Sequence, residues 1–133
     1  MVLARRGARQ HHREVGGRQI QNAGTVAGNL CNASPAADGV PPLLALRAEI
    51  EVAGQNGSRN VPLDKFIAGS RRTVLAPGEL VVAVHVPRPR HQARSAFVKL
   101  GARRYLVISI AMAAATLEID EGHVTAARVA VGA

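Results

Sequence analysis

The sequence predicts an α+β fold, and three observations support this class. Short segments of alternating or continuous apolar residues occur along most of the chain and are typical of β-strands. Segments that suit helices are few and short, and they do not alternate with strands as repeated βαβ units would require. The chain has 133 residues, of which 47% are hydrophobic, so it is long enough to bury one core.

The first half of the chain is expected to contain one short helix and several strands. A helical segment is predicted over residues 35–48, because Pro41 and Pro42 suit a first turn, where a missing N–H has no cost. The next predicted elements are a strand at 49–53, a turn at 54–58, a returning strand at 59–63, a helical turn at 63–67 and a strand at 80–86. Pro87 ends the last of these strands.

The second half is expected to contain three strands, the last two of which form a hairpin. Strands are predicted at 95–100, 108–119 and 124–131, and residues 120–123 form the turn of a C-terminal hairpin. Prolines and charged residues cluster at 87–91, which indicates a boundary between two parts. The predicted organisation is a basic, disordered start at 1–14, a first domain at 15–90 and a second domain at 91–133.

The charge is strongly basic, with 17 Lys and Arg against 9 Asp and Glu, which gives +8. Five arginines fall within the first eighteen residues: Arg5, Arg6, Arg9, Arg13 and Arg18. Basic chains can bind nucleic acid or anionic membranes. However, aromatic residues make up only 2%, no nucleic-acid motif is present, and the longest apolar stretch (106–117) is too short to span a bilayer. A solvated basic surface is therefore predicted, with no nucleic-acid or membrane partner.

Cysteine and histidine usage argues against a metal site or a catalytic nucleophile. Cys31 is the single cysteine, so it forms no intramolecular disulfide and cannot by itself hold zinc or an iron–sulfur cluster. A lone thiol and the absence of a secretory signal fit the reducing cytoplasm. The five histidines lack ligand spacing, and the serines, Ser109 included, lack a nucleophile context.

Residues 15–34 are rich in glycine, asparagine and small side chains, and they are interpreted as a loop that lacks the bulk to enter a core. Residues 22–29 read Asn-Ala-Gly-Thr-Val-Ala-Gly-Asn, and such a loop can surround a diphosphate with backbone N–H groups. The spacing matches neither a Walker A loop nor a Rossmann fingerprint, so an ordinary turn remains the simpler interpretation. Asp38 likewise suits a helix N-cap or a hydrogen-bond acceptor for a ligand.

A longer pattern makes the interpretation specific. The run over residues 18–38, together with 41–46, 61–66, 75–80 and 96–104, resembles the second flavin-binding segment and the following parts of molybdenum hydroxylase FAD subunits. This is the class of xanthine dehydrogenase and carbon monoxide dehydrogenase. The resemblance covers residues 15–133. It implies a partial FAD-binding domain of the vanillyl-alcohol-oxidase (PCMH) type, followed by the start of the family's C-terminal α+β domain.

The resemblance also implies roles for individual residues. The segment from Thr25 through Val26, Ala27 and Gly28 to Asn29 matches the loop that contacts the FAD diphosphate. The remaining positions are Asn32 and Asp38, which hydrogen-bond the flavin side of the cofactor, Leu75, which lies beside the isoalloxazine ring, and Lys99, which lies near that ring. No residue is implied as a catalytic acid or base.

This chain departs from the family pattern in two ways. Ala27-Gly28 stands where the family usually has Gly-Gly, and if position 27 needs a positive φ, alanine costs about 1 kcal/mol there. The family's first flavin loop is expected before residue 15, and residues 1–14 do not resemble it. The last domain ends after one hairpin. The chain is therefore expected to be truncated at both ends and to hold FAD weakly, with one of two contact sets.

The function implied by the resemblance is electron transfer. Electrons would leave a molybdenum centre, cross two [2Fe–2S] clusters and reach FAD, which passes them to an acceptor such as NAD. The implied partners are a molybdopterin-binding large subunit and a [2Fe–2S] small subunit. Two alternatives remain open: a remnant that binds no flavin and acts as an interaction module, and a basic polyanion binder, which the lack of aromatic platforms disfavours.

Overall fold

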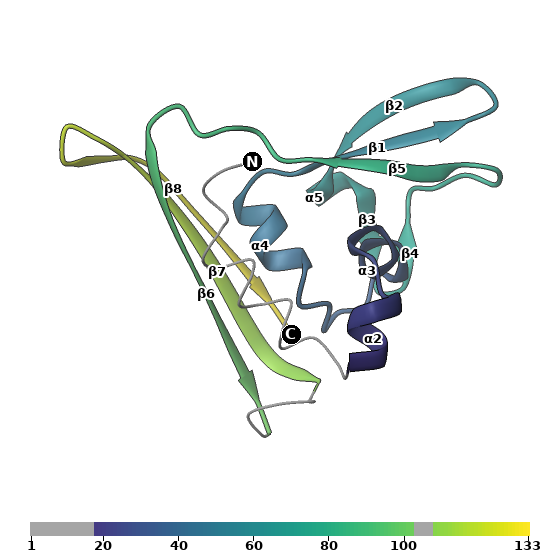
Figure 1. Ribbon diagram of the computed structural model, residues 1–133, viewed down its shortest axis with the longest axis horizontal. Helices are drawn as coiled ribbons and strands as arrows, with labels where there is room; N and C mark the ends of the chain where they lie inside the picture. Colours follow the sequence, from purple (N-terminus) through teal and green to yellow (C-terminus); the bar gives the residue numbers. More distant parts are fainter. Residues whose placement is uncertain (1–17, 103–107) are drawn as a thin grey trace.

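The computed structural model describes residues 18–102 and 108–133 (Figure 1). The expected basic start at 1–14 lies outside these residues. The helices are α2 (Arg18–Ala23), α3 (Val26–Asn32), α4 (Val40–Ala45) and α5 (Leu63–Phe66). The strands are β1 (Glu49–Gly54), β2 (Gly57–Pro62), β3 (Ile67–Gly69), β4 (Arg72–Thr73), β5 (Leu80–His85), β6 (Gln92–Gly101), β7 (Ser109–Asp120) and β8 (His123–Gly132). Short helices combined with antiparallel sheets confirm the α+β class.

The first sheet has the order β2-β1-β5, and both of its pairings are antiparallel. The strand predicted at 49–53, its returning partner and the strand at 80–86 are therefore confirmed. The β1–β2 hairpin turns before Gly57, whose φ of 107° is one that a side chain rarely adopts. Ile50 and Val52 alternate with Glu49 and Glu51 along β1, so the two apolar side chains share the buried face.

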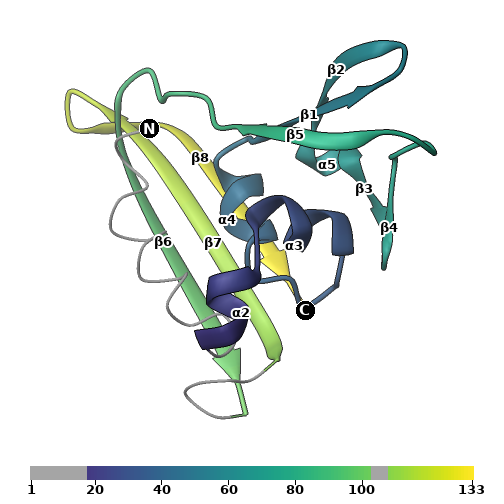
Figure 2. The same ribbon diagram turned by 45° about the vertical axis from the view of Figure 1, so that its right-hand side comes forward.

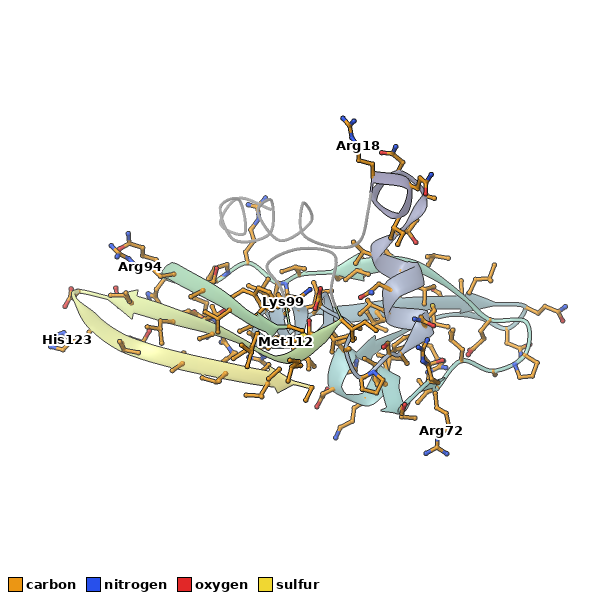
Figure 3. The ribbon with its side chains drawn as sticks, turned by 90° about the horizontal axis from the view of Figure 1, so that it is seen from below. Arg18, Arg72, Arg94, Lys99, Met112 and His123 are labelled. Carbon is orange, nitrogen blue, oxygen red and sulfur yellow. The ribbon has the colours of Figure 1, made fainter. Side chains whose placement is uncertain are left out.

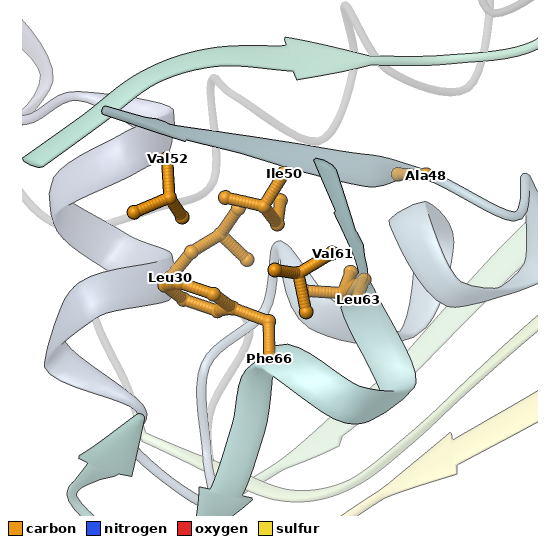
Figure 4. Close-up of a cluster of buried hydrophobic side chains, with 7 residues drawn as sticks. All are labelled: Leu30, Ala48, Ile50, Val52, Val61, Leu63 and Phe66. Carbon is orange, nitrogen blue, oxygen red and sulfur yellow. The ribbon is translucent and has the colours of Figure 1, made fainter. Parts of the chain in front are cut away.

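One cluster of buried side chains forms the main core (Figure 4). Its members are Leu30, Ala48, Ile50, Val52, Val61, Leu63 and Phe66. They come from α3, β1, β2 and α5 and the short connections between them, so helices and first sheet share a single core. Phe66 has an exposed fraction of 0%, and the other members of the cluster are aliphatic.

The interpretation of residues 15–34 as a loop is wrong for the described part. Residues 18–32 form α2 and α3, and Leu30 is fully buried in the core. Thr25 explains where α3 begins, because its Oγ1 accepts a hydrogen bond from the Gly28 backbone N–H at 2.9 Å, which is an N-cap. A seven-residue helix that buries one residue leaves almost no periodic signal in a sequence of small side chains.

Helix α4 is shorter than predicted, and it packs between the first half of the chain and the second sheet. It runs from Val40 to Ala45 within the expected 35–48 segment, with its prolines in the first turn. Pro41 and Ala45 are buried, and α4 packs against β7 and β8. Figures 1 and 2 show α4 between the second sheet and the elements of the first core.

The second sheet has the order β6-β7-β8, with antiparallel pairings, and its hairpin turn at residues 120–123 is as predicted. Met112 and Ala114 face α4 and are buried. The opposite face is open: Val98, which pairs with Ala113, is 65% exposed, and Val131, which pairs with the same residue, is 73% exposed. In the part of the chain that the structure describes, no helix is both long enough and apolar enough to cross a membrane.

Candidate cofactor-binding site

The segment Thr25–Asn29 is the first turn of helix α3. The first N–H groups of a helix have no acceptor inside it. The Thr25 hydroxyl oxygen accepts a hydrogen bond from the Gly28 N–H. The N–H groups of Val26 and Ala27 belong to the same first turn and are available to a ligand or to water. Ala27 does not have a positive φ and is therefore not strained. The described non-glycine residues with a positive φ are Ala33, Arg47, Arg71 and Glu121. Alanine suits a helical position.

Asn29 carries a buried polar atom at the inner side of α3. Its Oδ1 has no hydrogen-bond partner among the described residues, although it is shielded from solvent. The backbone of Gly39 passes close by, since a Cβ built there would lie 2.9 Å from Asn29 Oδ1. A buried oxygen without a donor is unusual and is expected at places where a ligand or an ordered water completes the bonding.

Asp38 is the centre of a buried polar network. It is 8% exposed, and its Oδ2 accepts a hydrogen bond from Lys99 Nζ at 2.6 Å. Its Oδ1 accepts a hydrogen bond from the hydroxyl of Ser109. The N-cap of α4 is Gly39, which makes no side-chain cap bond, so the interpretation of Asp38 as an N-cap is wrong.

The network brings together two of the predicted site residues and one that was missed. Lys99 comes from β6 and Ser109 from β7, whereas Asp38 precedes α4. Lys99 and Met112 lie near the middle of the molecule, whereas Arg18 and Arg94 project outward (Figure 3). Ser109 lacks a nucleophile context in the sequence, and no local pattern marks a serine that bonds a carboxylate 71 positions away.

Asn32 lies at the other end of α3 and has a different partner. Its Oδ1 accepts a hydrogen bond from Arg71 Nη1, and the Arg71 backbone N–H donates to Ala33 O at 2.8 Å. Arg71 has a φ of 58° in the turn between β3 and β4, which directs its side chain back to the helix. Asn32 thus contacts the β3–β4 turn. Asn29, by contrast, lies beside Gly39, which follows Asp38.

Leu75 occupies the connection between β4 and β5. It is half-buried and packs against the main core cluster. Its backbone N–H donates weakly to Thr73 Oγ1 at 3.4 Å. The nine predicted residues therefore do not form one group: Thr25–Asn29 form the start of α3, Asp38 pairs with Lys99, Asn32 contacts the β3–β4 turn, and Leu75 packs against the main core cluster.

A pocket of about 310 Å³ lies elsewhere. It is lined by residues 33–35, the start of α4, residues of β3 and the end of β8, and it contains none of the nine predicted residues. Its lining carries no charged side chain. Over residues 18–102 and 108–133, no three His, Cys, Asp or Glu side chains gather in a group that could hold a metal ion.

Comparison with known proteins places the chain in a family. The family described as the FAD binding domain in molybdopterin dehydrogenase matches residues 2–89, so the match includes residues that the sequence analysis left outside the resemblance. The xanthine dehydrogenase FAD-binding subunit of Escherichia coli O157:H7 is 34% identical over 119 residues, which are 89% of this chain and 41% of that protein. The nicotinate dehydrogenase FAD-subunit of Eubacterium barkeri is 35% identical over 114 residues, covering 84% and 38%.

Solved structures agree with this assignment. Carbon monoxide dehydrogenase from Oligotropha carboxidovorans superimposes with a TM-score of 0.85 at 29% identity, covering 93% of this chain and 43% of that one. Quinoline 2-oxidoreductase from Pseudomonas putida 86 gives 0.79 at 32% identity, covering 90% and 41%. The chain belongs to the family of FAD-binding domains of molybdopterin dehydrogenases, whose cofactor is FAD. It spans about two fifths of the length of these relatives.

Proposed function

We propose that this chain binds FAD and forms part of the electron-transfer subunit of a molybdopterin-dependent dehydrogenase. The observation that carries the proposal is the grouping of Asn29, Asp38 and Lys99. Three polar side chains expected at the FAD come from α3, the segment before α4 and β6: Asp38 and Lys99 are in contact, and Asn29 lies beside the backbone of Gly39, which follows Asp38. Asp38 and Lys99 are paired with each other, whereas the buried Oδ1 of Asn29 has no partner among the described residues, which favours a ligand at that position.

The residues present fit the chemistry of a flavin dinucleotide. The Val26 and Ala27 N–H groups suit a diphosphate, because backbone dipoles at a helix start favour anions. The unpaired Asn29 Oδ1 accepts a hydrogen bond, and Lys99 brings a positive charge beside the Asp38 carboxylate. Asn32 adds an amide at the other end of α3 and is included in the proposed site with Thr25 and Gly28.

The protein's part in the reaction would be placement. FAD, when bound, supplies the redox chemistry, while the side chains around it set its orientation and exclude water. In this proposal, Asp38 and Lys99 orient the polar side of the cofactor, and Leu75 gives an apolar surface to the isoalloxazine ring. No side chain of the site needs to act as an acid or a base.

The proposal extends to the complex in which the chain works. We infer a molybdopterin-binding large subunit and a [2Fe–2S] small subunit as partners, NAD or a similar acceptor for the electrons, and a cytoplasmic location. Support comes from relatives named as FAD subunits of dehydrogenases. The lone Cys31 is consistent with this, because one thiol cannot by itself ligate an iron–sulfur cluster.

Titration of the purified 133-residue chain with FAD by calorimetry tests the proposal. Saturable binding is expected, and Asp38→Ala and Asn29→Ala should each weaken it by about tenfold, the loss of one hydrogen bond to a desolvated ligand. Asn60→Ala is the matched control, because Asn60 is exposed on β2 and should leave affinity unchanged. Binding that is absent, or equal in wild type and both site variants, would contradict the proposal.

A second candidate function is favoured by the open face of the second sheet. Val98, Val129 and Val131 are among the most exposed apolar residues, and contiguous apolar surface is typical of interaction sites. In this alternative the chain binds no flavin and acts as an interaction module. The FAD titration separates the two functions, because only the first predicts saturable binding that depends on Asp38.

A further inference from the structure

The backbone on both sides of Leu75 is held by hydrogen bonds from elsewhere in the chain. Before Leu75, the Val74 carbonyl accepts from Arg59 Nη2 at 3.2 Å, and the Val74 N–H donates to Phe66 O at 3.0 Å. After Leu75, the Ala76 N–H donates to a carboxylate oxygen of Glu79 at 2.8 Å.

Arg59 and Glu79 also bind each other. Arg59 Nε donates to Glu79 Oε1 at 3.1 Å, and Nη2 donates to Oε2 at 2.9 Å, which is the two-point geometry that fixes orientation as well as distance. The contacts close a ring that runs from Arg59 through Val74, Leu75 and Ala76 to Glu79 and back. We call this set of contacts the Leu75 clamp.

The end of β1 is shaped to accommodate the clamp. A Cβ at Gly54 would lie 3.2 Å from Glu79 Cγ and 3.5 Å from the Gly78 carbonyl oxygen, so glycine leaves the space that the Glu79 side chain uses. The hydrogen bond from Arg59, followed by that from the Ala76 N–H, lowers the pKa of Glu79 to about 2. The Glu79 carboxylate is therefore ionised at any physiological pH. It becomes protonated, and its pairing with Arg59 is lost, only as the pH falls toward that value.

Stability alone is a weak reason for this arrangement. The side chains of Arg59 and Glu79 are 46% and 20% exposed, and neither belongs to the main core cluster. Exposed ion pairs contribute little to the free energy of unfolding. By contrast, several hydrogen bonds hold the backbone of Val74 and Ala76 on the two sides of Leu75, and convergent contacts of this kind restrict position.

We propose that Arg59 and Glu79 are positioning residues, which hold segment 74–79 and so determine where Leu75 meets the flavin ring. This inference rests on the proposed function, in which Leu75 lies beside the isoalloxazine. The clamp touches the ligand only through Leu75. Its loss should therefore alter binding of the ring and leave binding of the diphosphate at α3 unchanged.

Calorimetric titration of the full chain with FAD and with ADP, which lacks the ring, tests this. Glu79→Gln and Arg59→Lys should weaken FAD binding by about tenfold and shift the visible absorption of bound flavin, while ADP affinity changes by less than about twofold. Asp64→Asn is the control. Asp64 forms an exposed ion pair with Lys65, with 3.9 Å between Oδ2 and Nζ, and takes no part in the Leu75 clamp. Equal losses for FAD and ADP would mean a general structural defect and would overturn the inference.

Amide hydrogen exchange gives a reading that needs no flavin. The Ala76 N–H should exchange about tenfold faster in Glu79→Gln than in wild type or Asp64→Asn, because its acceptor is weakened. Unchanged exchange at Ala76 would overturn the inference whatever the ligand data show. If wild type binds no FAD, the proposed function fails together with the ring contact, and the exchange rate then decides whether the pair holds the segment.

Discussion

The sheet β2-β1-β5 and the sheet β6-β7-β8 differ in what covers them. The first packs on α3 and α5, and its inward residues Ile50 and Val52 meet Phe66 in the main core. The second packs on α4 with one face, where Met112, Ala114 and the polar Thr116 are buried, and leaves Val129 on its other face 71% exposed. Among the described residues, the first sheet is therefore stabilised by apolar burial, while the second packs on the short helix α4 and makes polar contacts.

The difference shows how the second sheet is attached. Asp38 reaches across from the segment before α4 and bonds Lys99 on β6 and Ser109 on β7. These are buried charged contacts, whose loss is expensive although their net contribution is modest. Asp38 and Lys99, two of the proposed cofactor residues, lie at this junction, so this part of the site depends on the two parts remaining in register.

The largest expected effect is in the first core. Phe66→Ala should lower the free energy of unfolding by about 3–5 kcal/mol, because it removes a fully buried ring and leaves a cavity. Val129→Ala on the open sheet face should change it by less than about 0.5 kcal/mol. Urea unfolding followed by circular dichroism measures both. Similar losses at the two positions would show that Val129 is covered in solution and would break the comparison.

A medium effect is expected at the junction. Lys99→Met should cost about 2–3 kcal/mol, because it leaves the Asp38 carboxylate buried without its cation. Combining it with Asp38→Asn should cost less than the sum of the two single losses, which a double-mutant cycle in urea detects. Lys65→Met, at an exposed pair, is the matched control and should stay within about 0.5 kcal/mol. Additive losses would mean that the two residues act independently.

The smallest expected effect concerns the backbone of α3. Ala27→Gly should lower stability by about 0.5–1 kcal/mol, because glycine weakens a helix, whereas a positive φ at this position would give the opposite sign. Gly57→Ala should also destabilise, by about 1 kcal/mol, because Gly57 does have a positive φ. Thermal unfolding compared between the two variants measures the effect, and a more stable Ala27→Gly protein would refute the helical geometry.

Several elements could be predicted because their signals are local. The strands at 49–53 and 80–86 and the hairpin around 120–123 follow from apolar alternation and from turn residues that lie next to one another. The resemblance named Asp38 and Lys99, and the structure places them in contact. The division into parts near residue 90 and the role of each site residue stay predictions.

Other features had no local signal. The sequence predicts a loop where helices α2 and α3 occur. Glycine and asparagine are typical of turns, and the start of α3 depends on the cap at Thr25. Three hydrogen-bonded pairs join residues that are far apart in the sequence. The separations are 71 positions for Asp38 and Ser109, 39 for Asn32 and Arg71, and 20 for Arg59 and Glu79. No spacing rule connects residues at such separations.

The sequence by itself determined the fold class, most strands and the family to which the chain belongs. Those properties depend on neighbouring residues or on a run of letters, both of which a sequence displays directly. Only the tertiary structure decided that Asp38 bonds Lys99 and Ser109, that Leu30 enters the core, and that Arg59 and Glu79 enclose the backbone at Leu75. The physical reason is that a hydrogen bond extends about 3 Å, so its partners are chosen by how helices and sheets pack.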